Sequence, residues 1–207
     1  YEDLSQNNAN KIKVIGPLLS EEANSAFKEH HKKDVSVLVF SFIGTIYKKL
    51  RNPEPIIKFF DKVFENEDRT VILNFYGDTN DVDINNYLVK NINLYFHGQV
   101  SRLEALAAMK KSDFLINIGN TTSYQLPSKV VEYLASQKPI INISSIDNDS
   151  SKRVLSNFSN TLNINIENLN SVKEMDSFLQ LCEHSTDQTL SHDERDISEF
   201  SLKNISQ

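Results

Sequence analysis

Runs of apolar residues recur along most of the chain and predict its strands. The run from Val35 to Ile43 is apolar at almost every position and rich in β-branched and aromatic residues. Similar runs predict further strands at residues 70–76, 92–97, 114–118, 139–143 and 161–166. Because these runs do not alternate between apolar and polar residues, they are typical of strands buried on both faces.

Segments with apolar residues at helical spacing separate these runs. They predict helices at residues 53–64, 81–90, 101–110, 127–136, 150–158 and 171–182. Ser101 and Glu104 have the spacing of a capping box at the start of one of these helices. Strand–helix repetition favours a parallel sheet, so the predicted fold class is α/β: a three-layer α/β/α, Rossmann-like domain with a parallel sheet of about six strands.

The alternation begins near residue 35 and ends near residue 182, which divides the chain into three parts. Residues 1–34 are an N-terminal approach segment and linker. A short apolar run lies at Val14–Leu19, and the polar residues 21–33 after it form either a linker or a weak helix. Residues 35–182 form the predicted Rossmann-like domain, and residues 183–207 are a polar C-terminal tail. Because the chain begins with Tyr1 and not Met, we expect a fragment or a processed product.

Charge and composition exclude several classes of protein. The chain has 22 Lys and Arg against 28 Asp and Glu, a net charge of -6, so it lacks the surplus of positive charge that a general nucleic-acid binder needs. The single cysteine, Cys182, excludes an internal disulfide and a cysteine-based zinc site. It also suits a reducing compartment, and with no secretory signal in the sequence we expect a cytoplasmic location.

Four of the predicted strands are followed directly by glycine, at Gly44, Gly77, Gly98 and Gly119. Each glycine by itself suits a tight turn. The carboxyl ends of parallel strands meet at one edge of the sheet, and ligands of such sheets bind beyond that edge. Four glycines there favour an open crevice lined by backbone.

The segment from Asn117 to Tyr133 is the most informative part of the sequence. Pro127 suits the first position of a helix that turns Ser128, Lys129 and Glu132 away from the sheet. A first-turn lysine opposes the helix dipole unless an anion binds there, and a diphosphate is the natural anion. Glu132, one turn deeper, has the reach to accept hydrogen bonds from ribose hydroxyls. The alternative is a surface ion pair between Lys129 and Glu132.

A second candidate anion site follows the first predicted strand. Beyond Gly44, a loop carries Lys48, Lys49 and Arg51 before the helix that begins at Pro53. Basic side chains at the carboxyl edge of a parallel sheet are well placed to bind phosphate, and arginine adds bidentate geometry. The alternative is a solvated basic loop.

These segments, in this order, resemble the C-terminal, donor-binding half of group-1 GT-B glycosyltransferases over residues 12–182. The most specific part of the resemblance is Pro127-Ser128-Lys129, followed by Glu132-Tyr133 and Lys138-Pro139. The resemblance implies that the donor diphosphate is bound by Arg51, Leu126, Pro127, Ser128 and Lys129, and that Glu132 binds the ribose of the nucleoside. We expect the sugar and the crevice around it to be lined by Gly44, Thr45, Asn117, Gly119, Asn120 and Gln125.

The resemblance implies transfer of a sugar, with retention, from a UDP- or GDP-sugar to an acceptor in polysaccharide or glycolipid assembly. The nucleotide sugar is then a substrate, and neither a cofactor nor a metal is expected. The partner is an N-terminal acceptor-binding half that this chain lacks, so we expect the chain to bind donor and to be inactive alone. The full enzyme is expected at the inner face of the membrane, and no catalytic residue is assigned.

One departure from the family pattern concerns the donor sugar. The family often carries a second glutamate eight positions before Glu132, where this chain has Tyr124 with Gln125 beside it. Two alternative functions stay open: part of a nucleotide-sugar epimerase, and a non-catalytic α/β interaction domain. Asp81 and Asp83 form an Asp-x-Asp pair that we interpret as a helix cap and not as a metal site. His97, at a strand end, is interpreted as structural or as lining the crevice.

Overall fold

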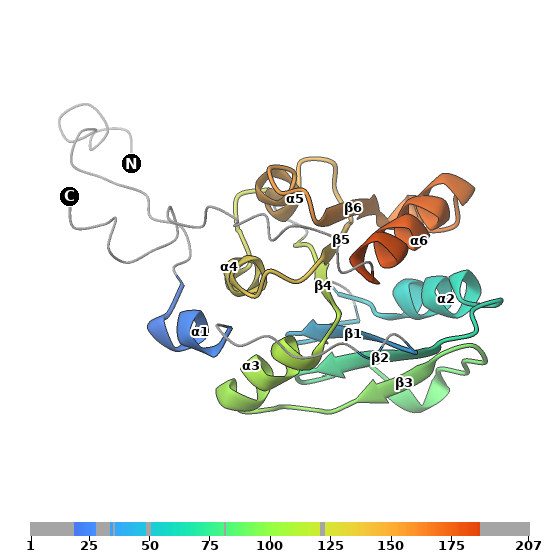
Figure 1. Ribbon diagram of the computed structural model, residues 1–207, viewed down its shortest axis with the longest axis horizontal. Helices are drawn as coiled ribbons and strands as arrows, with labels where there is room; N and C mark the ends of the chain where they lie inside the picture. Colours follow the sequence, from blue (N-terminus) through green and yellow to red (C-terminus); the bar gives the residue numbers. More distant parts are fainter. Residues whose placement is uncertain are drawn as a thin grey trace.

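The computed structural model describes residues 19–27, 34, 36–48, 51–80, 82–120 and 123–186. They form one parallel six-stranded sheet of order β3-β2-β1-β4-β5-β6 (Figure 1). The strands are β1 (Val37–Ile43), β2 (Thr70–Tyr76), β3 (Asn93–Phe96), β4 (Phe114–Ile118), β5 (Ile140–Ser144) and β6 (Thr161–Asn165). The prediction of a three-layer domain with a parallel sheet of about six strands is confirmed.

Helices cover both faces of the sheet. They are α1 (Glu21–Ala26), α2 (Glu54–Val63), α3 (Arg102–Lys111), α4 (Ser128–Ala135), α5 (Ser150–Leu155) and α6 (Val172–Thr186), with short 3₁₀ helices η1 (Ile84–Asn86) and η2 (Ile166–Asn168). Helices α2 and α6 pack on one face, and α1, α3, α4 and α5 on the other (Figure 1). Among the helices that the structure describes, none is long and apolar enough to cross a membrane.

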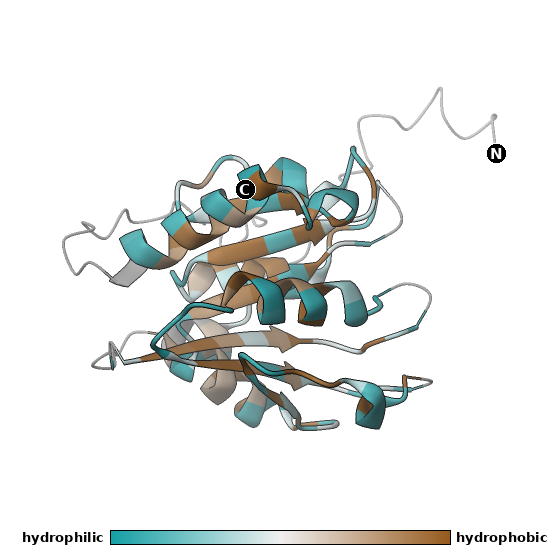
Figure 2. Ribbon diagram, turned by 90° about the vertical axis from the view of Figure 1, so that its right-hand side faces the viewer, coloured by the Kyte–Doolittle hydropathy of each residue, from teal (hydrophilic) through white to brown (hydrophobic). Residues whose placement is uncertain are grey.

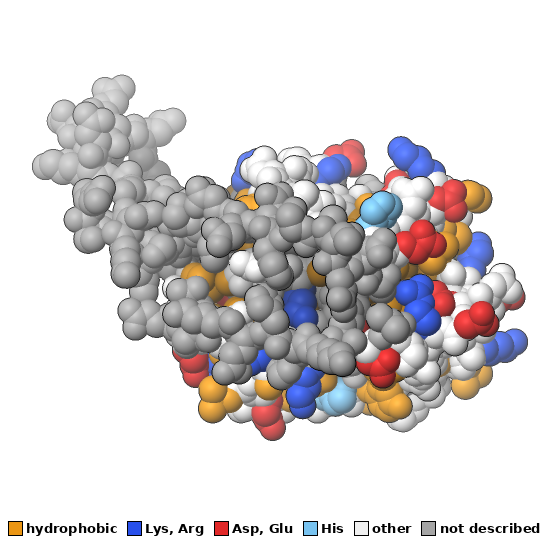
Figure 3. Space-filling model, in the orientation of Figure 1, with side chains coloured by type: hydrophobic (Ala, Val, Ile, Leu, Met, Phe, Trp, Pro, Cys, Tyr) orange, Lys and Arg blue, Asp and Glu red, His pale blue; other side chains and the backbone are white. Residues whose placement is uncertain are grey.

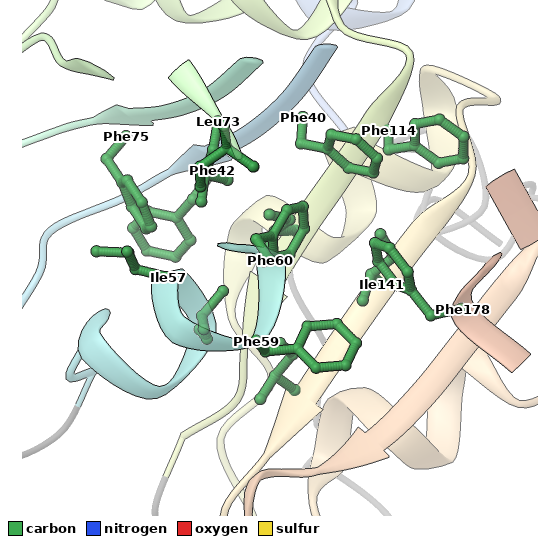
Figure 4. Packing of buried hydrophobic residues seen from close by; sticks show 14 of the residues in the cluster. Phe40, Phe42, Ile57, Phe59, Phe60, Leu73, Phe75, Phe114, Ile141 and Phe178 are labelled. Atoms are coloured by element: carbon green, nitrogen blue, oxygen red, sulfur yellow. The ribbon is translucent and has the colours of Figure 1, made fainter. Parts of the chain in front are cut away.

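The core on the α2 side is rich in phenylalanine. The ring of Phe40, on the central strand β1, lies 4.9 Å from that of Phe60 on α2, 4.6 Å from that of Phe114 on β4 and 5.8 Å from that of Phe178 on α6 (Figure 4). One residue thus links two helices and two strands. Strands and inner helix faces are apolar and outer helix faces polar, as Figure 2 shows, which is the pattern that gives three layers.

The opposite face of the sheet carries a row of three side-chain amides, of which Asn117 and Asn142 are buried and Asn163 is half-buried. Asn117, Asn142 and Asn163 lie in register on β4, β5 and β6. The side chain of Asn117 donates to that of Asn142 at 2.6 Å, and Asn142 donates to Asn163 at 2.9 Å. Each amide supplies the partner that its neighbour needs away from water, so the row tolerates burial. It lies directly below the carboxyl edge of β4 and β5.

The helix predicted at residues 81–90 is wrong. Of its described residues, 82–90, the single 3₁₀ turn η1 is the only helical part. The Asp83 side chain accepts a hydrogen bond from the Asn85 amide at 3.2 Å and so caps this turn. Asp83 is therefore a cap, as interpreted, but of a 3₁₀ turn and not of an α-helix. Asp81 lies outside the described residues.

Contacts with α2 explain why the segment is not a longer helix. The carboxylate of Asp61 accepts hydrogen bonds from the amides of Lys90 and Asn91, both at 2.7 Å. These bonds hold the backbone extended alongside α2. Leu88, whose apolar character contributed to the helical pattern, is 94% exposed and packs on no core.

Other expectations differ by smaller amounts. Within the segment expected as linker or weak helix, residues 21–26 form α1, and residues 28–33 lie outside the described residues. Ser20 caps α1 by accepting a hydrogen bond from the Ala23 amide at 3.2 Å. Pro127 is the N-cap of α4, with extended backbone, and not its first helical residue. Most of the apolar run predicted at Val14–Leu19 and the tail beyond residue 186 lie outside the described residues.

Candidate functional site

The glycines that follow β1 to β4 gather at one edge of the sheet. The Gly44 amide donates to the carbonyl of Tyr76 at 2.8 Å, and the Gly77 amide donates to the carbonyl of Gly98 at 2.7 Å. Gly77 has φ +134°, and a side chain there would collide with the carbonyl oxygen of Gly44. Glycine at this position therefore permits two loops to approach closely. Gly119 ends β4 at the same edge.

Two hollows open at this edge and meet at shared residues. One, of about 300 Å³, lies between the end of β4 and the start of α4. The other, of about 450 Å³, lies between the ends of β1 and β2 and the start of α3. Ile43, Gly44 and Lys129 line both hollows. A ligand with two parts could therefore occupy both, with its junction near Lys129.

The start of α4 faces the 300 Å³ hollow. Leu126, Pro127, Ser128 and Lys129 all line it. Pro127 has no side-chain acceptor to offer as N-cap, and within the described part of the chain no side chain caps this helix. The first-turn amides and the positive end of the helix dipole are thus directed toward a space that can hold an anion.

Two basic side chains reach the same hollow from different elements. Arg51, in the loop before α2, and Lys129, in the first turn of α4, both line it. Arg51 donates to the side-chain oxygen of Asn120 at 2.8 Å, which directs its guanidinium across the hollow toward the end of β4. Lys48 lines a separate hollow beside α2, and Lys49 lies outside the described residues.

The positive charge around this hollow is local. Charged side chains of both signs are interspersed over the face that Figure 3 shows, outside the part drawn in grey. The chain as a whole is acidic, with a net charge of -6. The positive groups of Arg51, Lys129 and the start of α4 are therefore gathered at one small hollow, and they do not form part of an extended basic surface.

Glu132 lies beneath Lys129 and pairs with two cations. Its Oε2 is 2.8 Å from Lys129 Nζ, and its Oε1 is 2.9 Å from a guanidinium nitrogen of Arg102. The Glu132 side chain is only 10% exposed. Its hydrogen bond with Arg102 is the main cause that raises the pKa of that guanidinium above its ordinary value. The ion pair expected as the alternative is therefore present, but it is mostly buried and shared with Arg102.

The residues expected around the sugar divide into two layers. Asn120 and Gln125 lie at the mouth, where the side-chain Nδ2 of Asn120 donates to the Gln125 backbone carbonyl at 3.0 Å. Asn117 lies below them as part of the buried amide row, and its nitrogen is bonded to Asn142. Gly119 lies against Asp149, and a Cβ added to this glycine would be 2.5 Å from the Asp149 carboxylate.

The 450 Å³ hollow has an aromatic wall. Tyr76 lines it, and the ring of His97 stacks on Tyr76 from behind with ring centroids 4.1 Å apart. The Nε2 atom of His97 is 2.8 Å from the Asn74 side-chain oxygen, and burial lowers the pKa of His97. His97 is thus a structural support of the wall, one of the two roles expected for it.

Sequence reasoning missed several residues of this second hollow. Gln99, Val100 and Arg102 line it, and none of them was selected as a candidate. The available signal was their place between the end of β3 and the first residue of α3, at the carboxyl edge of the sheet. Tyr133 was also missed as a contact: its hydroxyl accepts a hydrogen bond from the Ile43 amide at 2.9 Å and so fastens α4 to the end of β1.

Comparison with known proteins establishes the type of fold. Neither a protein-family model nor a curated protein sequence matches this chain. Among solved structures, MurG of Acinetobacter baumannii is similar over 77% of this chain and 44% of its own, with a TM-score of 0.52 and 8% identity. The glycotransferase of kitacinnamycin is similar over 88% of this chain and 44% of its own, with a TM-score of 0.53 and 18% identity.

At these identities the similarity concerns the fold alone. The described residues form a domain of the GT-B type, as the resemblance in sequence implied. The chain spans less than half the length of the two glycosyltransferases that it matches.

Proposed function

We propose that this domain binds the nucleotide-diphospho-sugar donor of a glycosyltransferase. The observation that carries the proposal is the meeting of Arg51, Lys129 and the uncapped start of α4 around one 300 Å³ hollow. These groups offer two cations and a helix N-terminus to one anion, and a diphosphate matches them in charge and size. The GT-B-type fold supports the same assignment.

The proposed mechanism follows from where charge develops. When the anomeric C–O bond of the donor breaks, the electron pair stays on the diphosphate and its negative charge increases. Amides at the start of α4, with Lys129 and Arg51, stabilise that charge from fixed positions. In this proposal the backbone of Leu126, Pro127 and Ser128 forms the turn that faces the diphosphate. Groups of the protein itself therefore stabilise the charge of the diphosphate.

The proposed position of the diphosphate also fixes where the nucleoside and the sugar of the donor bind. The nucleoside occupies the 450 Å³ hollow, which Tyr76, Gln99 and Val100 line. Glu132 lines neither hollow in the structure, but it contacts Lys129 and Arg102, which both line the 450 Å³ hollow, and in this proposal it accepts hydrogen bonds from the ribose hydroxyls. The sugar lies at the 300 Å³ hollow, which Gly44, Asn117, Asn120 and Gln125 line, with Gly119 at the adjoining end of β4. Thr45, which was also expected near the sugar, lines the 450 Å³ hollow instead. Because Lys129 lines both hollows, it marks the junction that the diphosphate would occupy.

The wider proposal comes from the family resemblance. It comprises a UDP- or GDP-sugar as donor, retention at the anomeric carbon, and an acceptor in polysaccharide or glycolipid assembly. It also comprises a second, acceptor-binding domain as partner, without which this domain binds donor and does not transfer the sugar. The full enzyme would act in the cytoplasm at the inner face of the membrane.

Calorimetric titration of UDP, GDP and their sugars tests the proposal. Lys129→Ala and Arg51→Ala should each weaken nucleotide binding by roughly 1 to 3 kcal/mol, the scale of a lost charge-assisted hydrogen bond. Lys62→Ala, which removes an exposed lysine of α2, is the matched control and should leave binding unchanged. Unchanged affinity in both site variants would reject the assignment. Absence of binding by the unaltered domain to all of these nucleotides would favour a non-catalytic interaction domain.

A further inference from the structure

Arg102 connects three helices through its guanidinium group. This first residue of α3 reaches Glu132 on α4 at 2.9 Å and Glu22 on α1 at 3.0 Å. It also donates to the Ser20 hydroxyl, at the start of α1, at 2.7 Å. Each nitrogen of the guanidinium thus has its own acceptor, so the position of the group is fixed from several directions.

Lys129 and Arg102 are not equivalent partners of Glu132. Lys129 has a flexible stem, and its Nζ lies at the hollow where the proposed diphosphate binds. If Lys129 turns to the diphosphate, it leaves one oxygen of a carboxylate that is only 10% exposed. A carboxylate with so little access to water needs a remaining counter-charge, and Arg102 supplies it on the other oxygen.

We infer that Arg102 is a positioning residue for ribose recognition, which holds the Glu132 carboxylate in a fixed orientation while Lys129 turns from Glu132 to the diphosphate. This inference rests on the proposed function. Arg102 does not itself contact the reacting atoms. It occupies Oε1 of Glu132 and leaves Oε2, together with the second lone pair of Oε1, to accept from the two hydroxyls of the ribose.

The role predicts an effect that depends on the ribose hydroxyls. A nucleotide without the 2′ and 3′ hydroxyls cannot use Glu132 and should therefore be indifferent to whether Arg102 orients it. A variant of Arg102 should weaken binding of the ribonucleotide by a much larger factor than binding of the dideoxynucleotide. A residue that merely stabilised the fold would weaken both ligands alike.

The experiment compares UDP and GDP with their 2′,3′-dideoxy forms by calorimetry on the whole chain. The unaltered chain should bind the ribonucleotide about tenfold more tightly than the dideoxy form, as expected for lost hydrogen bonds to a charged group. Glu132→Gln and Arg102→Gln should each abolish most of this preference, and Arg102→Lys should restore part of it. Arg69→Gln, which breaks the pair with Glu67 at the opposite edge of the sheet, is the control and should keep the preference.

A milder variant keeps the test informative if Arg102→Gln does not fold, as judged by circular dichroism. Glu22→Gln loosens Arg102 from α1 without altering either hollow, and it should reduce the preference in the same direction by a smaller factor. If Glu132→Gln loses the preference while the Arg102 variants and Glu22→Gln keep it, the role of Arg102 is refuted and the proposed function stands. If the unaltered chain binds none of the nucleotides, both the proposed function and this inference fail.

Discussion

The hydroxyl of Tyr133 accepts a hydrogen bond from the backbone amide of Ile43 across 90 residues of sequence. Tyr133 lies in α4, and Ile43 is the last residue of β1, next to Gly44. Ile43 and Gly44 line both hollows of the candidate site. The bond therefore fixes α4, which carries Lys129 and Glu132, to the edge of the sheet where the ligand is proposed to bind.

Tyr133→Phe should lower the free energy of unfolding by about 1 to 3 kcal/mol, because it leaves the buried Ile43 amide without its acceptor. Urea denaturation measures this loss. Tyr95→Phe is the matched control, since Tyr95 is 49% exposed and should tolerate the change. Equal stability of the Tyr133 variant and the unaltered chain would show that the bond does not hold α4 in place.

Gly77→Ala should destabilise the domain by at least about 2 kcal/mol, because its φ of +134° is strained for alanine and the new Cβ meets the Gly44 carbonyl. Gly98→Ala provides the comparison. Gly98 also has a positive φ, of +68°, but open space surrounds its Cβ position, so only the backbone cost of about 1 kcal/mol applies. Equal losses in the two variants would contradict the close approach of the two loops.

The amide row predicts a large effect from one buried asparagine. Asn142→Ala removes the partner of both Asn117 and Asn163 and should cost about 2 to 3 kcal/mol of stability, measured by thermal and urea unfolding. Asn170→Ala, at an exposed position, should cost little. A similar small effect at both positions would mean that water replaces the lost partners.

His97 predicts a dependence of stability on pH. Burial lowers its pKa below the ordinary value of 6.5, so the folded chain binds fewer protons than the unfolded chain at mildly acidic pH. The stability that His97 contributes is therefore complete above about pH 6.5 and is lost as the pH falls through that value toward the folded pKa. His97→Gln should reduce the fall in melting temperature between pH 7.5 and pH 5.5. An identical fall in both proteins would contradict this role.

Much of the fold was predictable because its signals are local. The apolar run at Val35–Ile43 lies at β1, and the capping box of Ser101 and Glu104 forms at the start of α3. The convergence of Arg51 and Lys129 could also be anticipated, since carboxyl ends of parallel strands share one edge. Each of these features depends on neighbours in the sequence or on a general rule of sheet topology.

The features that were not predicted depend on pairs distant in the sequence. Arg102 meets Glu132 30 residues later and Glu22 80 residues earlier, and nothing in the local pattern indicates either contact. The helix expected at residues 81–90 fails because Asp61, on another element, binds the backbone at its end. Local helix propensity takes no account of hydrogen bonds to residues that are distant in the sequence.

The most direct test of the central claim is a ¹⁵N NMR titration of the domain with UDP and with GDP. A diphosphate at the start of α4 should shift the amide resonances of Ser128 and Lys129 most strongly, because both residues lie in the first turn of α4 and line the 300 Å³ hollow. Gly44, which also lines this hollow, should follow. The same shifts should be much smaller in Lys129→Ala at equal nucleotide concentration. Saturable shifts confined to other parts of the chain, or none with either nucleotide, would contradict the claim.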